Sequence, residues 1–472
     1  MSEPVIWWVR KDLRLGDNVA LMSALEMGRP VIPVFILDEV FSTYGAAPLW
    51  RFGLGVQQLA QDLAALGSRL ILRRGPAAEV LAGLCDETGA KAVRWNRAYD
   101  PDQVTRDRAV KAVLGAHGID AKSLPGHLLF EPWAVETKDG GFYKVYSAFW
   151  RAVRGVDVGT PLEAPSRLSN PDVWPTSDQI GDWGLDARMR RGAPIVAAHV
   201  RVGAARALER LDRFIADRIG VYKERRDFPG EDATSGLSEN LAWGEISPRQ
   251  CWVAGQRAME EGAPGAEHFL KELVWREFAY HLVWHTPHIL TENWRAEWNG
   301  FPWRADPDAT DVLAWKQGRT GVPFVDAGLR EMYVTGRMHN RARMVVASYL
   351  TKHMLCHWRI GQAWFEDCLT DWDPASNAMG WQWVAGSGPD AAPYFRVFNP
   401  ETQLEKFDKG GVYRQRWIAE GQARPGPEAA SYFDAVPKGW ALCQEAAYPT
   451  EPIVPLAEGR ARALAAYQDR KG

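Results

Sequence analysis

The first third of the chain alternates short apolar runs with amphipathic stretches. The runs PVIWWVRK, RPVIPVFIL, RLILRR and KAVRWNRA have the length and the β-branched and aromatic content of strands. The stretches that begin at Asp17, Ala47, Pro76 and Asp100 have helical spacing. A strand followed by a helix, repeated, is typical of a doubly wound parallel sheet with helices on both faces. We therefore expect an α/β domain over residues 1–130.

The pattern changes after this region. Residues 131–195 are rich in Pro, Gly, Ser and Asp, as in GTPLEAPSRLSNPDVWP, and this composition indicates a long connection between domains. Helical periodicity then continues through RALERLDRFIADRI, AEHFLKELVWREFAYHLVWH and HNRARMVVASYLTKHMLCHW. We expect residues 196–472 to form a second domain that is almost entirely α-helical.

Composition is consistent with this division and excludes few functions. A chain of 472 residues is longer than one hydrophobic core usually organises, and 24% charged residues is ordinary for a globular protein. The net charge of −3 argues against a surface coated with cations, but a local basic patch can still bind nucleic acid. Neither a signal peptide nor a membrane span is recognisable. Five scattered cysteines without CxxC spacing favour reduced thiols in the cytoplasm over a metal site.

One helix face carries an unusual set of polar side chains. Glu272, Trp275, Arg276 and Ala279 are spaced at i, i+3, i+4 and i+7, so they share one face. The simplest interpretation is a solvated face with a Glu–Arg pair four residues apart, which stabilises a helix by only about 0.3 kcal/mol.

A second helix face resembles the first. Asn340, Arg343 and Met344 align in the same way, and an ordinary surface arginine would also explain this pattern. Both helices precede the irregular segment CLTDWDPASNAMGWQWVAGSG, which brings carboxylates and indoles together. We therefore expect the two faces to line one polar cavity, where Asp371 or Asp373 pairs with a buried arginine.

Thr234, Ser235 and Ser238 stand just before a helix, where hydroxyl and backbone N–H groups can bind a phosphate. Helix capping alone would also explain these residue types. No GxGxxG follows the first strand, so the sequence lacks the nicotinamide-dinucleotide fingerprint.

Taken together, these segments resemble the photolyase and cryptochrome family from end to end. The motifs occur in the family's order: WWVRKDLRLGDNVAL, FYKVYSAFWRA, TSGLSENLAWGEISPRQ, KELVWREFAYHL, GRTGVPFVDAGLREM, GRMHNRARMVVASYLTK and DWDPASNAMGWQWVAGSG. The resemblance implies an N-terminal α/β antenna domain and a C-terminal helical domain that holds FAD in a folded, U-shaped conformation.

The resemblance also implies which residues bind FAD. The matching positions are Tyr222, Thr234, Ser235, Gly236, Leu237, Ser238, Arg276, Asn340, Arg343, Asp371, Asp373 and Asn377. Tyr222 and the 234–238 segment match the positions that hold the FAD phosphates, and Arg343 with Asp371 matches an ion pair over the isoalloxazine ring. Asn377 matches the residue beside the redox-active nitrogen, where plant cryptochromes carry Asp. A neutral amide does not repel an anionic reduced flavin, so Asn377 favours a repair enzyme over a photosensor.

On the substrate side, the resemblance implies DNA that carries UV-induced pyrimidine dimers. A dimer must be flipped out of the duplex to meet a flavin, and photolyases are a known example of base flipping. The positions that match contacts to the flipped lesion and its flanking phosphates are Arg226, Glu272, Trp275, Arg341, Met344, Trp383 and Arg396. Enzymes for the (6-4) product carry two His where this chain has Asn340 and Met344, so cyclobutane dimers are the expected lesion. The implied mechanism is electron transfer from photoexcited reduced FAD, ring opening and return of the electron.

Three indoles match the family's electron-transfer chain from the flavin to the surface. They are Trp381, Trp358 and Trp303, and Trp315 is a neighbour that could be confused with the last of them. With Glu272 and Asn377 they form the expected catalytic set.

A second, antenna chromophore is also implied, and it could be a folate, a deazaflavin or a flavin. The segment YDPDQ replaces the Asn-Glu of folate-binding members, which disfavours folate. We expect a cytoplasmic monomer that associates with the nucleoid when it binds DNA. A cryptochrome-type photoreceptor is the alternative function, and the short segment after the last motif disfavours it. A flavin oxidoreductase is a third and less favoured alternative.

Overall fold

The computed structural model describes residues 3–391 and 395–470. Its N-terminal region contains five parallel strands in the order β3-β2-β1-β4-β5. The strands are β1 (Val5–Val9), β2 (Val31–Leu37), β3 (Ile71–Arg74), β4 (Ala92–Asn96) and β5 (Asp120–Leu124). The helices between them are α1 (Val19–Leu25), α2 (Ala46–Ala65), α3 (Ala77–Thr88) and α4 (Pro101–Ala116). The expected doubly wound sheet and the helical C-terminal part are confirmed.

Alternation along the strands determines which helices cover each face of the sheet. Val5, Trp7 and Val9 of β1 pack in the same hydrophobic cluster as α1 and α2. Ile6 and Trp8 point to the opposite face and pack with α3 and α4. Because successive strand residues point to opposite faces, both faces of an apolar strand are buried only when helices lie on both sides.

The helical region begins after a long connection. Its helices before the cavity-forming elements are α5 (Tyr146–Val153), α6 (Ala193–Ala197), α7 (Ala204–Asp217), α8 (Tyr222–Arg225), α9 (Ser238–Ala242) and α10 (Pro248–Glu260). They are followed by α11 (Ala266–His285), α12 (Thr310–Lys316), α13 (Pro323–Thr335), α14 (Asn340–Ser348), α15 (Trp358–Cys368) and α16 (Pro374–Ala385). A π-helical turn, Tyr349–His353, continues α14. The last helices are α17 (Pro400–Phe407), α18 (Val412–Trp417), α19 (Pro427–Ala435) and α20 (Leu456–Asp469).

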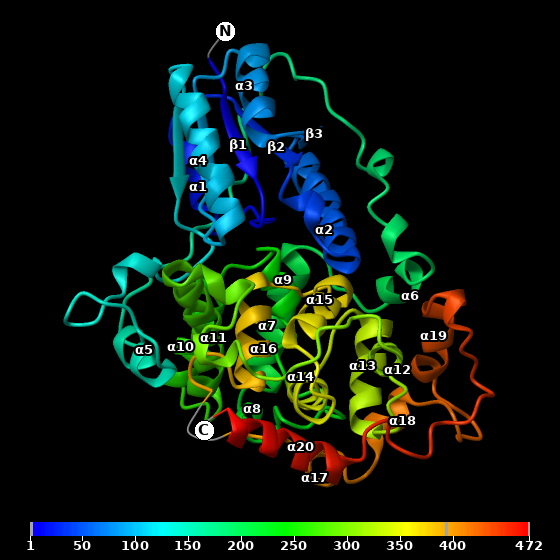
Figure 1. Ribbon diagram of the computed structural model, residues 1–472. Helices are drawn as coiled ribbons and strands as arrows, with labels where there is room; N and C mark the ends of the chain where they lie inside the picture. Colours follow the sequence, from blue (N-terminus) through cyan, green and yellow to red (C-terminus); the bar gives the residue numbers. More distant parts are fainter. Residues whose placement is uncertain (1–2, 392–394, 471–472) are drawn as a thin grey trace.

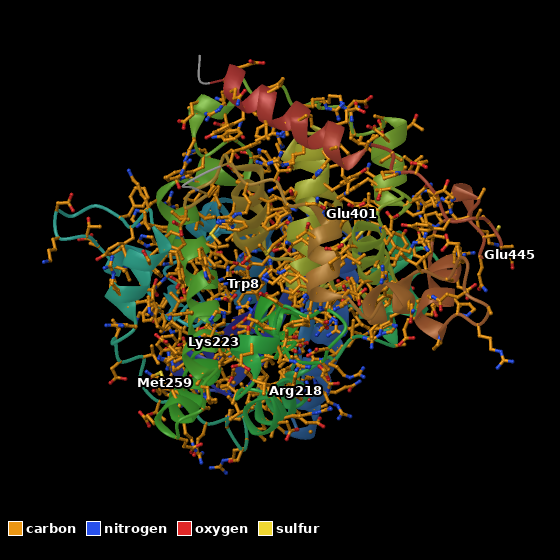
Figure 2. The ribbon with its side chains drawn as sticks, turned by 90° about the horizontal axis from the view of Figure 1, so that it is seen from below. Trp8, Arg218, Lys223, Met259, Glu401 and Glu445 are labelled. Carbon is orange, nitrogen blue, oxygen red and sulfur yellow. The ribbon has the colours of Figure 1, made fainter. Side chains whose placement is uncertain are left out.

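The two regions are stacked; the connection places α5 on one side of the molecule, and its later part runs along the other side to α6 (Figure 1). Viewed from the side opposite the sheet, the helical region lies in front of the strand residue Trp8 (Figure 2). Helix α5 lies inside the connection expected over residues 131–195, yet Tyr146 and Phe149 pack in the same core as α11. The domain boundaries drawn from the sequence stay a prediction.

Buried ionic contacts join the two regions. Arg51 of α2 pairs with Glu239 of α9 and donates to Glu245 at 2.7 and 2.9 Å, and all three side chains are fully buried. Glu277 of α11 accepts the backbone N–H groups of Leu129 and Phe130. A buried charge is tolerated only when it is paired and hydrogen-bonded, so these contacts fix the relative position of the two regions. Across the described residues, none of the helices combines the length and apolar character needed to cross a bilayer.

Candidate functional site

A cavity of about 350 Å³ lies in the helical region, between α11, α14, α15, α16 and the loop that precedes α16. Half of the site residues expected from the sequence line it. They are Arg226, Glu272, Trp275, Asn340, Arg343, Met344, Asp371, Asp373, Asn377, Trp381 and Trp383. The two polar helix faces and the irregular acidic segment therefore meet at one place.

One arginine in the cavity is held by a carboxylate of the facing loop. Asn340 begins α14, and Arg343 follows one turn later. The Arg343 Nη2 atom donates to both Asp371 carboxylate oxygens, at 2.7 and 3.0 Å, and Nε donates to the Met338 carbonyl at 2.8 Å. Asp373 instead caps α16 by accepting the Ser376 N–H, and its other oxygen accepts the Tyr280 hydroxyl. Asp371 is therefore the partner of the cavity arginine.

Glu272 does not pair with Arg276, although the two stand four residues apart on α11. The Glu272 carboxylate pairs with Arg226, which follows α8, and it lies 3.7 Å from His268 Nε2. Burial, together with the nearby Arg226, lowers the pKa of His268, so the arginine is the cation that balances Glu272 near neutral pH.

Arg276 points away from the cavity, toward the N-terminal region. Its guanidinium donates to the His127 carbonyl at 3.0 Å and to Glu277 at 3.1 Å. Arg276 was expected among the FAD-binding residues, and in this structure it joins the two regions instead of lining the cavity.

Two indoles form flat walls of the cavity. Trp275 is stacked on Tyr146 of α5, with ring centroids 3.6 Å apart and an interplanar angle of 5°. The Tyr146 hydroxyl donates to the Lys271 carbonyl, which fixes this backing ring. Trp383 donates to the Asp390 carbonyl at 3.2 Å, and Arg396 lies over its ring at 5.5 Å. Held indole faces of this kind can stack on a planar base.

The indoles expected to transfer electrons occupy α15, α16 and a neighbouring loop. Trp381 is 2% exposed and packs edge-on against Phe365 and Trp315. A Cβ on Gly361 of α15 would overlap the Trp381 ring, so a glycine there lets the two helices approach closely.

Farther from the cavity, His357 lies between the other two indoles. Its ring centroid is 5.4 Å from Trp358 and 5.3 Å from Trp303. Trp358 donates to Asn293 at 2.8 Å, and Trp303 donates to the Thr351 carbonyl at 3.0 Å. Trp315 thus contacts Trp381, whereas Trp303 is associated with Trp358 through His357.

The cavity presents groups that suit a polar aromatic cofactor. Asn377 donates from Nδ2 to the Gln362 carbonyl at 3.1 Å, which orients its amide at the cavity wall. Trp372 and Trp381 also line the cavity, and their buried indole N–H groups have no hydrogen-bond partner among the described residues. The Arg343–Asp371 pair and the oriented Asn377 amide supply the charged and neutral hydrogen-bonding groups that fit a bound flavin.

The segment expected to bind phosphates lies outside the cavity lining. Tyr222 begins α8, and Arg226 lies over its ring at 5.3 Å, so this ring is one side chain removed from the cavity. Ser235 Oγ accepts the Leu237 N–H just before α9, and Arg210 donates to the Gly236 carbonyl. The remaining members, Thr234 and Ser238, belong to the same turn.

The arginines expected to hold DNA phosphates already have interactions within the protein. Arg226 pairs with Glu272, and Arg341 donates to Asp227 at 2.6 Å while its guanidinium covers the Phe407 ring. Arg396 borders a smaller neighbouring pocket. A phosphate would therefore have to compete with these contacts.

Several cavity residues were missed by sequence reasoning. They are Phe365, Leu369, Trp372, Ser376, Met379, Gly380 and Val384. Trp372, between the two expected aspartates, carried a visible signal because indoles are rare in a loop, whereas the apolar residues looked like ordinary core positions.

Comparison with known proteins identifies the family. Residues 5–166 match the family model described as DNA photolyase, and residues 269–469 match the FAD binding domain of DNA photolyase. The chain is 45% identical to deoxyribodipyrimidine photo-lyase of Agrobacterium fabrum, over 99% of this chain and 98% of that protein. The chain belongs to the photolyase and cryptochrome family. Cryptochrome-1 of Arabidopsis thaliana is more distant, at 33% identity over 97% of this chain and 69% of that protein.

Solved structures of the family have the same fold. A bacterial class III photolyase from Agrobacterium tumefaciens superposes with a TM-score of 0.90 at 43% identity, covering 100% of this chain and 98% of the other. An archaeal photolyase from Sulfolobus tokodaii, solved with two FAD molecules, superposes with a TM-score of 0.80 at 29% identity, covering 99% and 100%. The FAD-binding domain assigned by the family model contains α11 and α14 to α16, which form the cavity.

Proposed function

We propose that this protein is a deoxyribodipyrimidine photo-lyase, an enzyme that uses light to split cyclobutane pyrimidine dimers in UV-damaged DNA. The observation that carries the proposal is the meeting, in one cavity, of the Arg343–Asp371 pair, the Asn377 amide and the indole faces of Trp275 and Trp383. The names of the photolyase relatives support the same activity. When bound, FAD supplies light absorption and one-electron chemistry.

The proposed division of labour follows the chemistry of each wall. Arg343, Asp371, Asp373, Asn340 and Asn377 bind the flavin. Within this set, the neutral Asn377 amide can donate a hydrogen bond to an anionic ring without charge repulsion. Tyr222, the 234–238 segment and Arg276 complete the proposed FAD set, and the observed inward contacts of Arg276 make it the member to test first.

The opposite wall is proposed to receive the lesion. Trp275 and Trp383 stack on the flipped bases, Met344 packs against them, and the Glu272 carboxylate accepts a hydrogen bond from a pyrimidine edge. The ion pair with Arg226 positions the Glu272 carboxylate until the lesion arrives. Crowded side chains exclude water from the flipped dimer, which strengthens each of these polar contacts.

Electron supply is proposed to run through Trp381, Trp358 and Trp303. Their N–H groups differ in environment, because Trp358 and Trp303 donate to oxygen atoms whereas the Trp381 N–H has no acceptor within the described residues. An acceptor next to an indole stabilises its oxidised, positively charged form. The outer two indoles are therefore better suited to hold a positive charge than the inner one.

The remaining expectations belong to the same proposal. An antenna domain over residues 1–130 binds a second chromophore of unspecified type, as the two FAD molecules of the archaeal neighbour suggest. The protein acts as a monomer on chromosomal DNA in the cytoplasm.

The test is repair by the purified, chemically pre-reduced protein. An oligonucleotide with one cyclobutane dimer should lose it under blue light but not in the dark, and a (6-4) substrate should be unchanged. Glu272→Gln should repair more slowly, because an amide offers a weaker acceptor than a carboxylate. A photoreceptor, the second candidate, would absorb light and leave both lesions intact.

A further inference from the structure

A second, smaller pocket shares a wall with the cavity. Trp383 and Val384 border both spaces. The small pocket has a volume of about 60 Å³, and its other walls include the aromatic rings of Trp298, Phe395 and Tyr467. Phe395 and Tyr467 are stacked, with centroids 4.4 Å apart and an interplanar angle of 4°.

The charge of this pocket is strongly one-sided. Its lining includes Arg295, Lys352, Arg396 and Arg470, and no carboxylate is found among the lining residues that the structure describes. Glu297 reaches Arg470 at 4.0 Å from outside the lining, and its side chain is 63% exposed. An exposed carboxylate at that distance compensates little of a cationic cluster.

Lys352 is the most unusual of these cations. It lies in the π-helical turn Tyr349–His353 and is 1% exposed, and its Nζ atom has no hydrogen-bond partner among the described residues. Nζ lies 3.3 Å from the centroid of the Phe395 ring. Burial lowers the pKa of Lys352 well below its ordinary value, and no carboxylate opposes this shift. A buried ammonium without a counter-ion costs much free energy, and π-turns are frequent at functional sites.

The pocket has room for a small oxyanion. A water molecule needs roughly 10 to 15 Å³ of such space, so about 60 Å³ admits a group of several heavy atoms. Gly386, with φ of +97°, keeps this space open. A Cβ at this position would lie 2.9 Å from the Trp298 ring and 3.5 Å from Lys352 Nζ.

We propose that the small pocket is a phosphate-binding site in which Lys352 and Arg470 hold one phosphate group beside the cavity. Tetrahedral oxyanions suit it because several basic side chains converge on one space, and an anion beside Lys352 favours its protonated form, which offers three N–H donors. The backbone phosphate next to a base seated against Trp383 is one source, and this part of the inference rests on the proposed function. Free inorganic phosphate is the other.

The first arm of the test measures binding to an oligonucleotide with one dimer as salt is varied. Lys352→Met and Arg470→Met should each weaken binding about tenfold at low salt, as expected for loss of a hydrogen bond between charged groups. Each should also make the slope of log K against log salt less steep by about 0.7 to 0.9, the contribution of one phosphate contact. Lys111→Met is the matched control, because Lys111 also lies over an indole, that of Trp95, in the sheet region. It should behave as the unmodified protein.

The second arm identifies the source of the phosphate. Methylphosphonates placed one at a time around the dimer should weaken binding at one position in the unmodified protein and have no effect there in Lys352→Met. Separately, inorganic phosphate should raise the melting temperature relative to chloride at equal ionic strength, and Lys352→Met should abolish this rise. A response to inorganic phosphate without the methylphosphonate effect would assign the pocket to free phosphate.

The inference is overturned if Lys352→Met and Arg470→Met bind DNA with unchanged affinity and slope and respond to phosphate as the unmodified protein does. Lys352→Met replaces a buried amino group that has no hydrogen-bond partner among the described residues with an apolar side chain of similar length, so the variant should still fold. If it does not fold, Arg470→Met tests the same pocket. Failure of the proposed function would be seen in a different measurement, because the dimers would stay intact under light. The binding and melting experiments would still test the pocket in that case.

Discussion

The molecule contains two places where a ligand would be sought, and they differ in how much space the protein's own side chains leave in them. In an open α/β sheet, ligands bind beyond the carboxyl ends of the strands where the strand order reverses, which here lies between β1 and β4. That crevice is nearly filled, with about 10 Å³ of space, whereas the helical cavity has about 350 Å³.

The contacts inside each space explain the difference. In the sheet crevice, Asn96 and Asn18 donate to Asp12, Arg10 donates to Asp107, and Lys11 is enclosed by aromatic rings. In the helical cavity, by contrast, the Arg343–Asp371 pair and the Asn377 amide line a space of about 350 Å³. Unpartnered donors do not separate the two places, because Lys11 Nζ in the crevice is also buried without a hydrogen-bond partner among the described residues. A place expected to bind a ligand by fold alone can thus be filled by the protein's own side chains.

The largest effect is expected from Trp381→Phe, which tests the helical cavity. Blue light with an external reductant should reduce the bound flavin at least tenfold more slowly, because a phenyl ring is much harder to oxidise than an indole. Pre-reduced variant should still split dimers, since repair uses an electron that returns to the flavin. Trp174→Phe, in the connection, is the control. Normal photoreduction, or complete loss of repair after pre-reduction, would contradict the assignment.

Asp107→Asn tests the sheet crevice. Asp107 accepts hydrogen bonds from Arg10, Arg106 and Trp95, so the change leaves buried arginines short of a counter-ion. The free energy of unfolding should fall by about 3 kcal/mol, measured by urea unfolding. Flavin content and repair rate of the folded variant should be unchanged. A loss of flavin at full folding would show that the crevice also controls the cavity.

Trp383→Ala should weaken binding of lesion-containing DNA by about 1 to 3 kcal/mol, because it removes one stacking surface. Photoreduction should continue, since Trp381 is retained. Binding titrations with damaged and undamaged duplex measure the effect, and an equal loss for both duplexes would place Trp383 outside the lesion contact.

The last prediction concerns the pH dependence of stability. Burial raises the pKa of Glu277 to about 7, against the opposing effect of Arg276 and two backbone donors. The folded protein therefore holds a proton that the unfolded chain releases above about pH 4.5, so this contribution to stability declines as pH rises from about 4.5 to 7. Glu277→Gln should remove the decline, which is at most about 1.4 kcal/mol per pH unit, as read from unfolding free energies. Parallel pH curves for the two proteins would contradict it.

Much of the architecture could be predicted from the sequence because β1 and β2 are apolar on both faces, and β3 and β4 contain shorter buried apolar runs, each followed by a helical pattern. Strand β5 was missed. Its sequence DAKSL lies at the sheet edge and is partly exposed, so its residues carry no apolar signal. Edge strands are defined by pairing with a neighbour, which local sequence does not encode.

The members of the cavity were predictable and their partners were not. The spacing on α11 allows an ion pair between Glu272 and Arg276. It does not show whether a residue distant in the sequence pairs with either side chain instead. Arg226 arrives from α8 and takes Glu272, while His127 and Glu277 draw Arg276 inward. The sequence did not distinguish Asp371 from Asp373 as the partner of the cavity arginine. The structure does, because Asp373 caps α16.

The stack of Tyr146 on Trp275 bears on how small a working fragment of this chain can be. A fragment that starts at residue 196 would keep α11 to α16 but would lose the Tyr146 ring that stacks on Trp275. It would also leave the Glu277 carboxyl without the N–H groups of Leu129 and Phe130. The lesion wall is therefore not a module that can be excised with the helical region. A truncated enzyme would have to begin before Leu129, at the boundary of the sheet itself.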